Sequence, residues 1–292
     1  MSRNMVFCAI ALVAALAIPS AADAATKSQY LVSLGDSYAA GYQATGIGTG
    51  KNTRNGFAYQ VPGLAKKRGY KLKLVNFGCG GATTTSILGE KLKAGAKCLG
   101  PGAPTFTGTQ IAAAEKFLKA NRDEVGLVTV SIGGNDVTAC AKAESAVDCV
   151  GKAIPKLEKN VKALVKRLRA AAGPKVRITG ITYPDVILGA WVGENPNQDL
   201  AKLSVVAFKS LMNPALKKAY EGVDGKFVDV TTATGAYTPL EQTTELAPYG
   251  VIPTAVAEAC RLSFYCQYRD IHATTEGYRI IADLVAKTLP KK

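Results

Sequence analysis

Short apolar segments that alternate with amphipathic helical segments constrain the fold of this chain more than any other feature. Five apolar runs predict strands over residues 30–34, 71–77, 125–132, 175–180 and 227–230. The apolar spacing between them predicts helices over residues 56–67, 110–120, 154–168, 200–220 and 275–287, the third ended by Gly173-Pro174. This alternation, without a linker or an internal repeat, predicts one α/β domain in which helices cover both faces of a parallel sheet.

The first 24 residues resemble a secretory signal peptide rather than folded structure. Arg3 gives a short positive segment, residues 6–18 are nearly all apolar, and Ala22-Asp23-Ala24 has the small-x-small pattern that precedes a cleavage point. The apolar run stops at Pro19, short of the roughly 20 residues that span a membrane. We therefore expect cleavage after Ala24 and a single domain over residues 25–292 that is secreted to an extracellular or periplasmic location.

Six of the seven cysteines remain after such a cleavage, an even number in a chain sent to an oxidising compartment. Six cysteines allow about 15 pairings, but these six fall into three couples that are close in sequence. We predict the disulfides Cys79–Cys98, Cys140–Cys149 and Cys260–Cys266. A zinc site is the alternative, but the chain lacks the C-x2-C spacing of a zinc knuckle.

The chain has a single histidine, His272. A catalytic zinc site built on two or three imidazoles is therefore excluded, and we expect no metal and no cofactor. If the protein uses imidazole chemistry, His272 supplies it, because the ordinary pKa of histidine, about 6.5, suits a general base at neutral pH.

Polar and glycine-rich segments follow three of the predicted strands and surround the histidine. They are residues 35–41 (Gly-Asp-Ser-Tyr-Ala-Ala-Gly), 76–83, 133–136 (Gly-Gly-Asn-Asp) and 269–278. In a parallel sheet the ligand crevice lies beyond the carboxyl ends of the strands. The segments offer a serine on a turn, backbone N–H groups, a side-chain amide and an imidazole, which are the groups that acyl transfer needs. Each segment alone fits an ordinary turn or cap equally well, but the combination indicates a site.

These four segments, in this order, resemble the sequence blocks of the SGNH or GDSL hydrolases, a family of serine esterases and lipases. The resemblance spans residues 35–278 and implies a three-layer, flavodoxin-like α/β fold with about five parallel strands. It implies Ser37 as nucleophile, His272 as general base, and Gly81 and Asn135 as oxyanion donors together with the backbone N–H of the nucleophile. The six cysteines further resemble the secreted, three-disulfide branch of the family.

Each of these roles has a physical reason. Ser37 begins the turn from a strand into a helix, whose N-terminus favours negative charge on the serine oxygen. The serine hydroxyl needs a nearby base to become a good nucleophile. Gly81 lets the backbone approach an oxyanion without a Cβ in the way, and Asn135 can aim its amide at the same point. We expect Asp36 and Asp136 to hold their turns through Asx hydrogen bonds rather than to act on substrate.

The carboxylate that should orient the histidine departs from the family pattern. The usual block reads Asp-x-x-His, but Arg269 stands three residues before His272, and the carboxylate, Asp270, stands only two before it. The side chain of Arg269 cannot accept a hydrogen bond. Three arrangements are open: Asp270 reaches the imidazole through a local turn, a main-chain carbonyl near Arg269 orients it, or a distant carboxylate does. We favour a Ser–His dyad assisted by the main-chain carbonyl.

The sequence does not separate a lipase, a phospholipase, a short-chain esterase and a carbohydrate deacetylase, which would share this catalytic core. We expect a small-molecule or lipid ester as substrate, with a polysaccharide deacetylase or a catalytically silent secreted binding protein as alternatives. Residues 43–55, 185–197 and 233–259 are long enough to form pocket walls. The aromatic residues that could line an acyl groove are Tyr42, Trp191, Tyr237 and Tyr249.

The chain is basic, with 36 Lys and Arg against 22 Asp and Glu and a net charge of +14. A solvated basic face is the ordinary explanation. The sharper hypothesis is peripheral contact with an anionic membrane or a cell-wall polymer. No segment is typical of a nucleic-acid-binding module, so we expect no nucleic-acid partner, and we expect a monomer.

Overall fold

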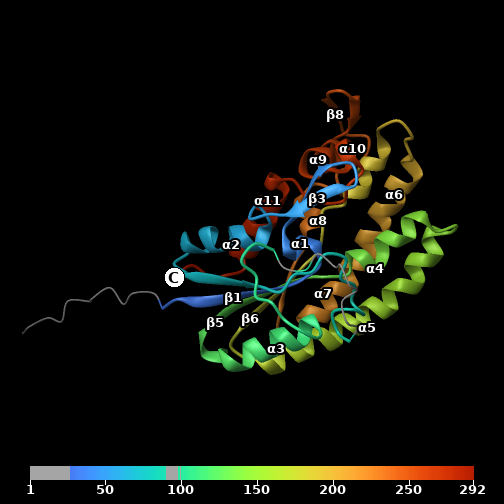
Figure 1. The fold of residues 1–292 in the computed structure, drawn as a ribbon. Helices are drawn as coiled ribbons and strands as arrows, with labels where there is room; N and C mark the ends of the chain where they lie inside the picture. Colours follow the sequence, from blue (N-terminus) through green and yellow to red (C-terminus); the bar gives the residue numbers. More distant parts are fainter. Residues whose placement is uncertain (1–26, 90–97, 99) are drawn as a thin grey trace, which may run out of the picture.

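The computed structural model describes residues 27–89, 98 and 100–292, so the predicted signal peptide lies outside the described residues. Five parallel strands form the central sheet in the order β4-β1-β5-β6-β7 (Figure 1). Their bounds are Gln29–Gly35 (β1), Leu72–Asn76 (β4), Val125–Ser131 (β5), Arg177–Ile181 (β6) and Lys226–Val228 (β7). Counted along the chain, this is the 2-1-3-4-5 order of flavodoxin-like folds, so the predicted fold class is confirmed.

The register of the sheet brings the ends of β1, β4 and β5 to the same edge. Ser33 of β1 pairs with Asn76, the last residue of β4. Two residues later, Gly35 pairs with Ser131, the last residue of β5. The three glycine-rich segments that follow these strands therefore start side by side.

Helices cover both faces of the sheet. On one face α2 (Phe57–Lys66) packs against α11 (Thr275–Lys287), and on the other α5 (Ala146–Ala172) packs against α3 (Gln110–Ala120) and α7 (Asn213–Glu221) (Figure 1). The predicted apolar face of α5 is buried, and the helix ends at Gly173 as expected.

The predicted helix over residues 200–220 is interrupted. It consists of α6 (Gln198–Val206), a π-helical segment (Ala207–Met212) and α7. Such π segments are uncommon and often lie at functional sites. The shorter elements are α1 (Ser37–Ala40), η1 (Arg122–Glu124), α4 (Gly134–Thr138), η2 (Ala139–Lys142), η3 (Val186–Trp191) and α8 (Val230–Ala233).

Two β-hairpins and a second apolar cluster were not predicted. The hairpins are β2 (Tyr42–Gly46) with β3 (Thr49–Asn52), and β8 (Thr243–Leu246) with β9 (Gly250–Pro253). The second cluster lies apart from the main core and joins residues of η3, α6, β9 and α9 (Thr254–Leu262). Trp191, Tyr237 and Tyr249 pack against this cluster.

Three disulfides join the predicted pairs, Cys79–Cys98, Cys140–Cys149 and Cys260–Cys266. Each closes a short loop, the last between α9 and α10 (Tyr265–Tyr268). Within the part of the chain that the structure describes, no helix has the length and apolar character needed to cross a bilayer.

Candidate active site

Ser37 lies on a sharp turn between β1 and α1, as the first residue of that helix. Gly35 has a φ of +134°, and a Cβ at this position would lie 2.0 Å from the carbonyl oxygen of Ser131, so the turn requires glycine. The buried amide of Gln110 pairs with the same residue in both directions. Gly35 N–H donates to Gln110 Oε1 and Gln110 Nε2 donates to Gly35 O, each at 2.8 Å.

The imidazole of His272 lies between a hydroxyl and a carboxylate. Its Nε2 is 2.8 Å from Ser37 Oγ and its Nδ1 is 2.7 Å from Asp270 Oδ1. The side chains of His272 and Asp270 are 14% and 16% exposed, so the pair is shielded but still reachable from solvent. With Nδ1–H donating to the carboxylate, Nε2 is left to accept the serine proton.

The partner of the imidazole corrects one expectation. Asp270 Oδ1 accepts both the Nδ1 contact and the backbone N–H of His272, the latter at 2.9 Å. This Asx turn makes a spacing of two residues sufficient. The favoured main-chain carbonyl near Arg269 was therefore wrong as the group facing Nδ1, and the local-turn arrangement is the one found.

Arg269 has a structural part in this turn. It adopts the left-handed conformation, with φ of +54°, and its guanidinium donates to the carbonyl oxygen of Val192 at 3.0 Å. Burial alone would raise the pKa of Asp270, but the hydrogen bonds and the charge of His272 outweigh burial and hold that pKa below its usual range.

Gly81 and Asn135 lie on neighbouring segments, a loop and a short helix. Asn135 is on α4, and its Nδ2 donates to the carbonyl oxygen of Ala82 at 2.9 Å. Gly81 is exposed and has a φ of +78°, with no atom within 4 Å of where a Cβ would be, so its conformation rather than crowding favours glycine. The contact brings the segment that carries Gly81 against Asn135, which also lines the pocket beside Ser37.

Two tyrosines that sequence reasoning missed support the turn. Tyr183 OH donates to Asp36 Oδ2 at 2.6 Å, and Tyr38 OH donates to the carbonyl oxygen of Ile271 at 2.7 Å. Asp36 Oδ1 accepts the N–H of Tyr38, which confirms the expected Asx hydrogen bond. Burial raises the pKa of Asp36 to about 6, although the hydrogen bonds from the Tyr183 hydroxyl and the Tyr38 N–H act to lower it. The only sequence signal for Tyr183 is its position just after β6.

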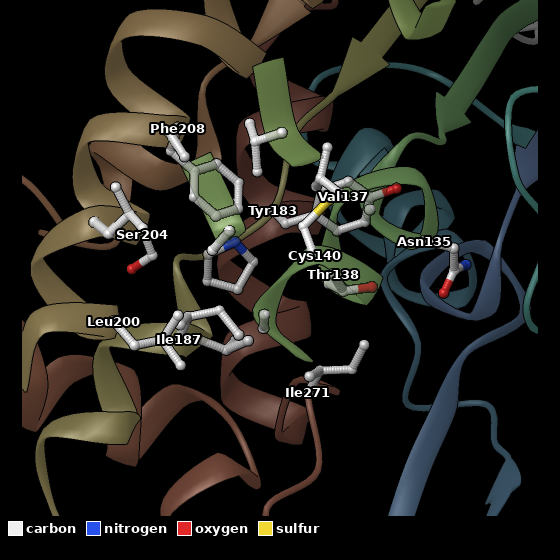
Figure 2. Close-up of a pocket in the computed structure, with 18 of the residues that line it drawn as sticks. Asn135, Val137, Thr138, Cys140, Tyr183, Ile187, Leu200, Ser204, Phe208 and Ile271 are labelled. Atoms are coloured by element: carbon white, nitrogen blue, oxygen red, sulfur yellow. The ribbon is translucent and has the colours of Figure 1, made fainter. Parts of the chain in front are cut away.

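An apolar pocket opens beside Ser37, which is one of its lining residues. Figure 2 shows side chains that line this pocket. One wall comes from α4, η2 and the start of α5, and the other from η3, α6 and the π segment. The apolar side chains include Val137, Cys140, Val150, Ile187, Leu200 and Phe208. Asn135 lies at one end of the pocket, away from the group formed by Leu200, Ile187 and Phe208 (Figure 2).

The three segments expected to form pocket walls differ in their contribution. Residues 185–197 supply Val186 and Ile187, whereas residues 43–55 and 233–259 supply none of the lining side chains. None of the four aromatic residues considered for an acyl groove lines the pocket. Tyr42 instead lies against the imidazole of His272, with ring centroids 4.4 Å apart.

Comparison with known proteins gives both a sequence family and a shared fold. The model of the GDSL-like lipase/acylhydrolase family matches residues 33–280. No curated protein matches the chain in sequence.

Among solved structures, the extracellular lipase from Streptomyces rimosus is 19% identical, with a TM-score of 0.54 over 89% of this chain and 99% of its own. Phospholipase A1 from Streptomyces albidoflavus is 16% identical, with a TM-score of 0.54 over 90% of this chain and 99% of its own. The lipase Lip_vut3 from a goat rumen metagenome is 15% identical, with a TM-score of 0.53 over 89% of this chain and 96% of its own. At these identities the likeness shows a common fold.

Proposed function

The chain belongs to the GDSL-like lipase/acylhydrolase family, and we propose that it is a secreted serine esterase that hydrolyses carboxylic esters through an acyl-enzyme on Ser37. The observation that carries the proposal is the hydrogen-bonded chain from Ser37 Oγ through the imidazole of His272 to Asp270. A nucleophile, a base and an orienting carboxylate in direct contact recur in serine hydrolases of unrelated folds.

In the acylation step, His272 Nε2 takes the hydroxyl proton while Ser37 Oγ bonds to the ester carbonyl carbon. The carbonyl oxygen becomes an oxyanion, which accepts hydrogen bonds from the N–H groups of Ser37 and Gly81 and from the amide of Asn135. Asp270 stabilises the imidazolium through Nδ1–H and stays ionised. The tetrahedral intermediate then collapses, the bond to the alcohol oxygen breaks, and His272 gives its proton to that oxygen.

Deacylation repeats these steps with water as the nucleophile. His272 takes a proton from water, the hydroxide oxygen bonds to the acyl carbon, and the same donors stabilise the second oxyanion. Collapse of this second intermediate breaks the bond between Ser37 Oγ and the acyl carbon and releases the carboxylic acid, while the proton held by His272 returns to Ser37 Oγ. Apart from the ester and water, every group in these steps belongs to this chain.

The pocket beside Ser37 supports an apolar acyl group as the part of the substrate that is recognised. Side chains from both walls, such as Val137, Leu200 and Phe208, offer it a largely apolar surface. Each methylene group buried there contributes about 0.8 kcal/mol to binding. This favours esters of longer acyl chains, including lipids, over acetylated carbohydrates.

Secretion is supported by two independent features. Residues 1–24 have the pattern of a signal peptide. Three disulfides are also typical of a protein that folds in an oxidising compartment. N-terminal sequencing of the exported protein should find Ala25 as its first residue.

A fluorophosphonate probe and a panel of esters test the proposed activity. The wild type should label at Ser37, and Ser37→Ala should neither label nor hydrolyse any ester. On esters graded from acetyl to dodecanoyl, kcat/KM should rise with acyl length. Preference for acetylated sugars would make the protein a carbohydrate deacetylase instead, and absence of labelling would make it a silent binding protein.

A further inference from the structure

We propose that Asp136 is a positioning residue, which holds the loop of Gly81 against α4 so that the donors from Gly81 and Asn135 converge on one point. The inference rests on the proposed function, because it assigns a role to a residue that does not touch the reacting atoms. Asp136 was expected only to hold its own turn. Its carboxylate instead reaches across to the other loop.

The carboxylate of Asp136 binds Thr84, which lies 52 residues earlier in the chain. Oδ2 accepts the backbone N–H of Thr84 at 2.9 Å, and Oδ1 accepts the Thr84 hydroxyl at 2.5 Å. Thr84 is fully buried, so neither of its donors has an alternative partner in water. Two hydrogen bonds to one carboxylate fix both the distance and the rotation of this part of the loop.

A third residue sets the direction of the hydroxyl proton. Asn160 of α5 donates through Nδ2 to Thr84 Oγ1 at 3.1 Å and to Thr85 Oγ1 at 3.2 Å. Because Thr84 Oγ1 accepts from Asn160, its single hydrogen is available for Asp136. A chain of hydrogen bonds therefore runs from Asn160 on α5 through Thr84 to the carboxylate of Asp136. This chain fixes the position of the loop relative to α5.

The neighbouring residue of α4 ties the same loop at a second point. Asn135 Nδ2 donates to the carbonyl oxygen of Ala82 at 2.9 Å. A primary amide has two N–H donors, so this contact orients the group and leaves the second donor for an oxyanion. Residues 135 and 136 thus hold the loop at Ala82 and Thr84, on the C-terminal side of Gly81.

The loop needs these hydrogen bonds to Ala82 and Thr84 because Gly81 has no side chain that could hold it in place. Gly81 is exposed, and no atom lies near its Cβ direction, so no side-chain packing fixes this peptide. An oxyanion donor must lie within about 0.5 Å of its working position to be effective, and a shift of about 1 Å can cost 10²-fold in rate. The Asp136 carboxylate supplies a fixed point three residues away.

The test compares variants by steady-state kinetics on one soluble ester. Asp136→Ala should lower kcat by about 10- to 100-fold and change KM by less than about twofold. Thr84→Val, which removes the hydroxyl donor, should lower kcat in the same way, while Thr84→Ser should keep wild-type kcat. Asp199→Ala, which removes an exposed carboxylate on α6, is the matched control and should have no effect.

A double-variant cycle separates positioning from a general loss of structure. If Asp136 acts on the oxyanion donors, its substitution in an Asn135→Ala background should lower kcat by about threefold or less, well below its effect alone. Additive losses, or a KM that rises in step with the fall in kcat, would overturn the proposal. If Asp136→Ala does not fold, Thr84→Val against Thr84→Ser decides the question, and equal kcat in these two overturns it.

Fluorophosphonate labelling separates a failure of the proposed esterase activity from a failure of the role of Asp136. The phosphoryl oxygen of the probe needs the same donors, so Asp136→Ala should label at Ser37 about 10-fold or more slowly than the wild type. A wild type that does not label removes the proposed function itself. A wild type and an Asp136→Ala variant that label equally fast leave the esterase intact and reject the role of Asp136.

Discussion

The proposed nucleophile and the proposed base are held by two parts of the molecule that are built in different ways. Ser37 follows β1, an inner strand of the parallel sheet, and its turn is fixed by Gly35, by the amide of Gln110 and by a buried carboxylate. His272 lies in a segment without regular helix or strand between α10 and α11. The first half owes its position to strand pairing, and the second to a set of separate hydrogen bonds.

Those hydrogen bonds come from several elements. The carbonyl oxygen of His272 accepts the N–H of Phe264, and the carbonyl of Ile271 accepts the Tyr38 hydroxyl. Gln43 of the first hairpin donates to the carbonyl oxygen of Ala273. The turn that carries Ser37 should therefore tolerate few changes in its backbone. The loss of any one hydrogen bond around His272 should instead misplace the imidazole only partly and lower activity by a smaller factor.

Removing the reacting group of either half should have the largest effect. Ser37→Ala and His272→Ala should each lower kcat by about 10⁶-fold, and the double variant should lose little more, because the two groups act as a unit. Steady-state kinetics on an activated ester measures this. Residual turnover above about 1% in His272→Ala would show that another group serves as base, which is a sharp test in a chain with one histidine.

Removal of the carboxylate that faces His272 should have the second largest effect on kcat. Asp270→Ala should lower kcat by about 10²- to 10⁴-fold, because Asp270 Oδ1 holds both the ring and the backbone of His272. Glu276→Ala, which removes an exposed carboxylate four residues after the histidine, is the control and should stay near wild type. A loss below about tenfold in Asp270→Ala would revive the main-chain carbonyl as the orienting group.

Removal of Cys260–Cys266 and removal of Cys140–Cys149 should have different kinetic effects, the first on the placement of His272 and the second on the shape of the pocket. Cys260–Cys266 closes the turn that carries Phe264, so its replacement by two serines should lower kcat about tenfold for all esters. Cys140 lines the pocket, so replacing Cys140–Cys149 should raise KM for long acyl chains and leave acetyl esters unchanged.

Both disulfide variants should lose about 2 kcal/mol of unfolding free energy, because the closed loops are short. Urea unfolding measures this loss, and ester kinetics on the folded variants measures the rest. Identical kinetic profiles for the two variants would contradict the division into two differently built halves.

The smallest effect concerns stability near the second cluster. Asp185 is buried, and its Oδ2 accepts the Ser204 hydroxyl. Burial raises the pKa of Asp185 to about 7. Between pH 4 and pH 7 the folded protein therefore holds a proton that the unfolded chain lacks, so the free energy of unfolding should fall as pH rises through this range.

Asp185→Asn mimics the neutral acid and should remove this part of the pH dependence. Its Tm should match that of the wild type near pH 4 and exceed it by about 2–4 °C or more at pH 8. Asp36, with a pKa of about 6, adds a trend of the same sign in both proteins. Equal Tm values at pH 8, by scanning calorimetry, would show that Asp185 ionises without cost.

The sheet and its strand ends could be predicted because each strand is a short apolar run that glycine or a polar turn follows. Both hairpins escaped prediction because their strands are only four or five residues long, and one of them, Thr49–Asn52, has no apolar side chain. The contact of Asp270 with the imidazole depends on the left-handed backbone of Arg269, which residue type does not signal. The hydrogen bonds of Tyr183 with Asp36 and of Thr84 with Asp136 join residues far apart in sequence, and no local pattern encodes such pairs.

The amide of Gln110 has a consequence for transferring this site to another protein. A graft of residues 35–41 alone would carry the serine but leave the N–H of Gly35 without the side-chain partner supplied by α3. The portable unit is therefore discontinuous, a strand end plus one glutamine 75 positions later. By the same reasoning, insertions in the connection between β4 and α3 should be accepted only where they leave the start of α3 in place.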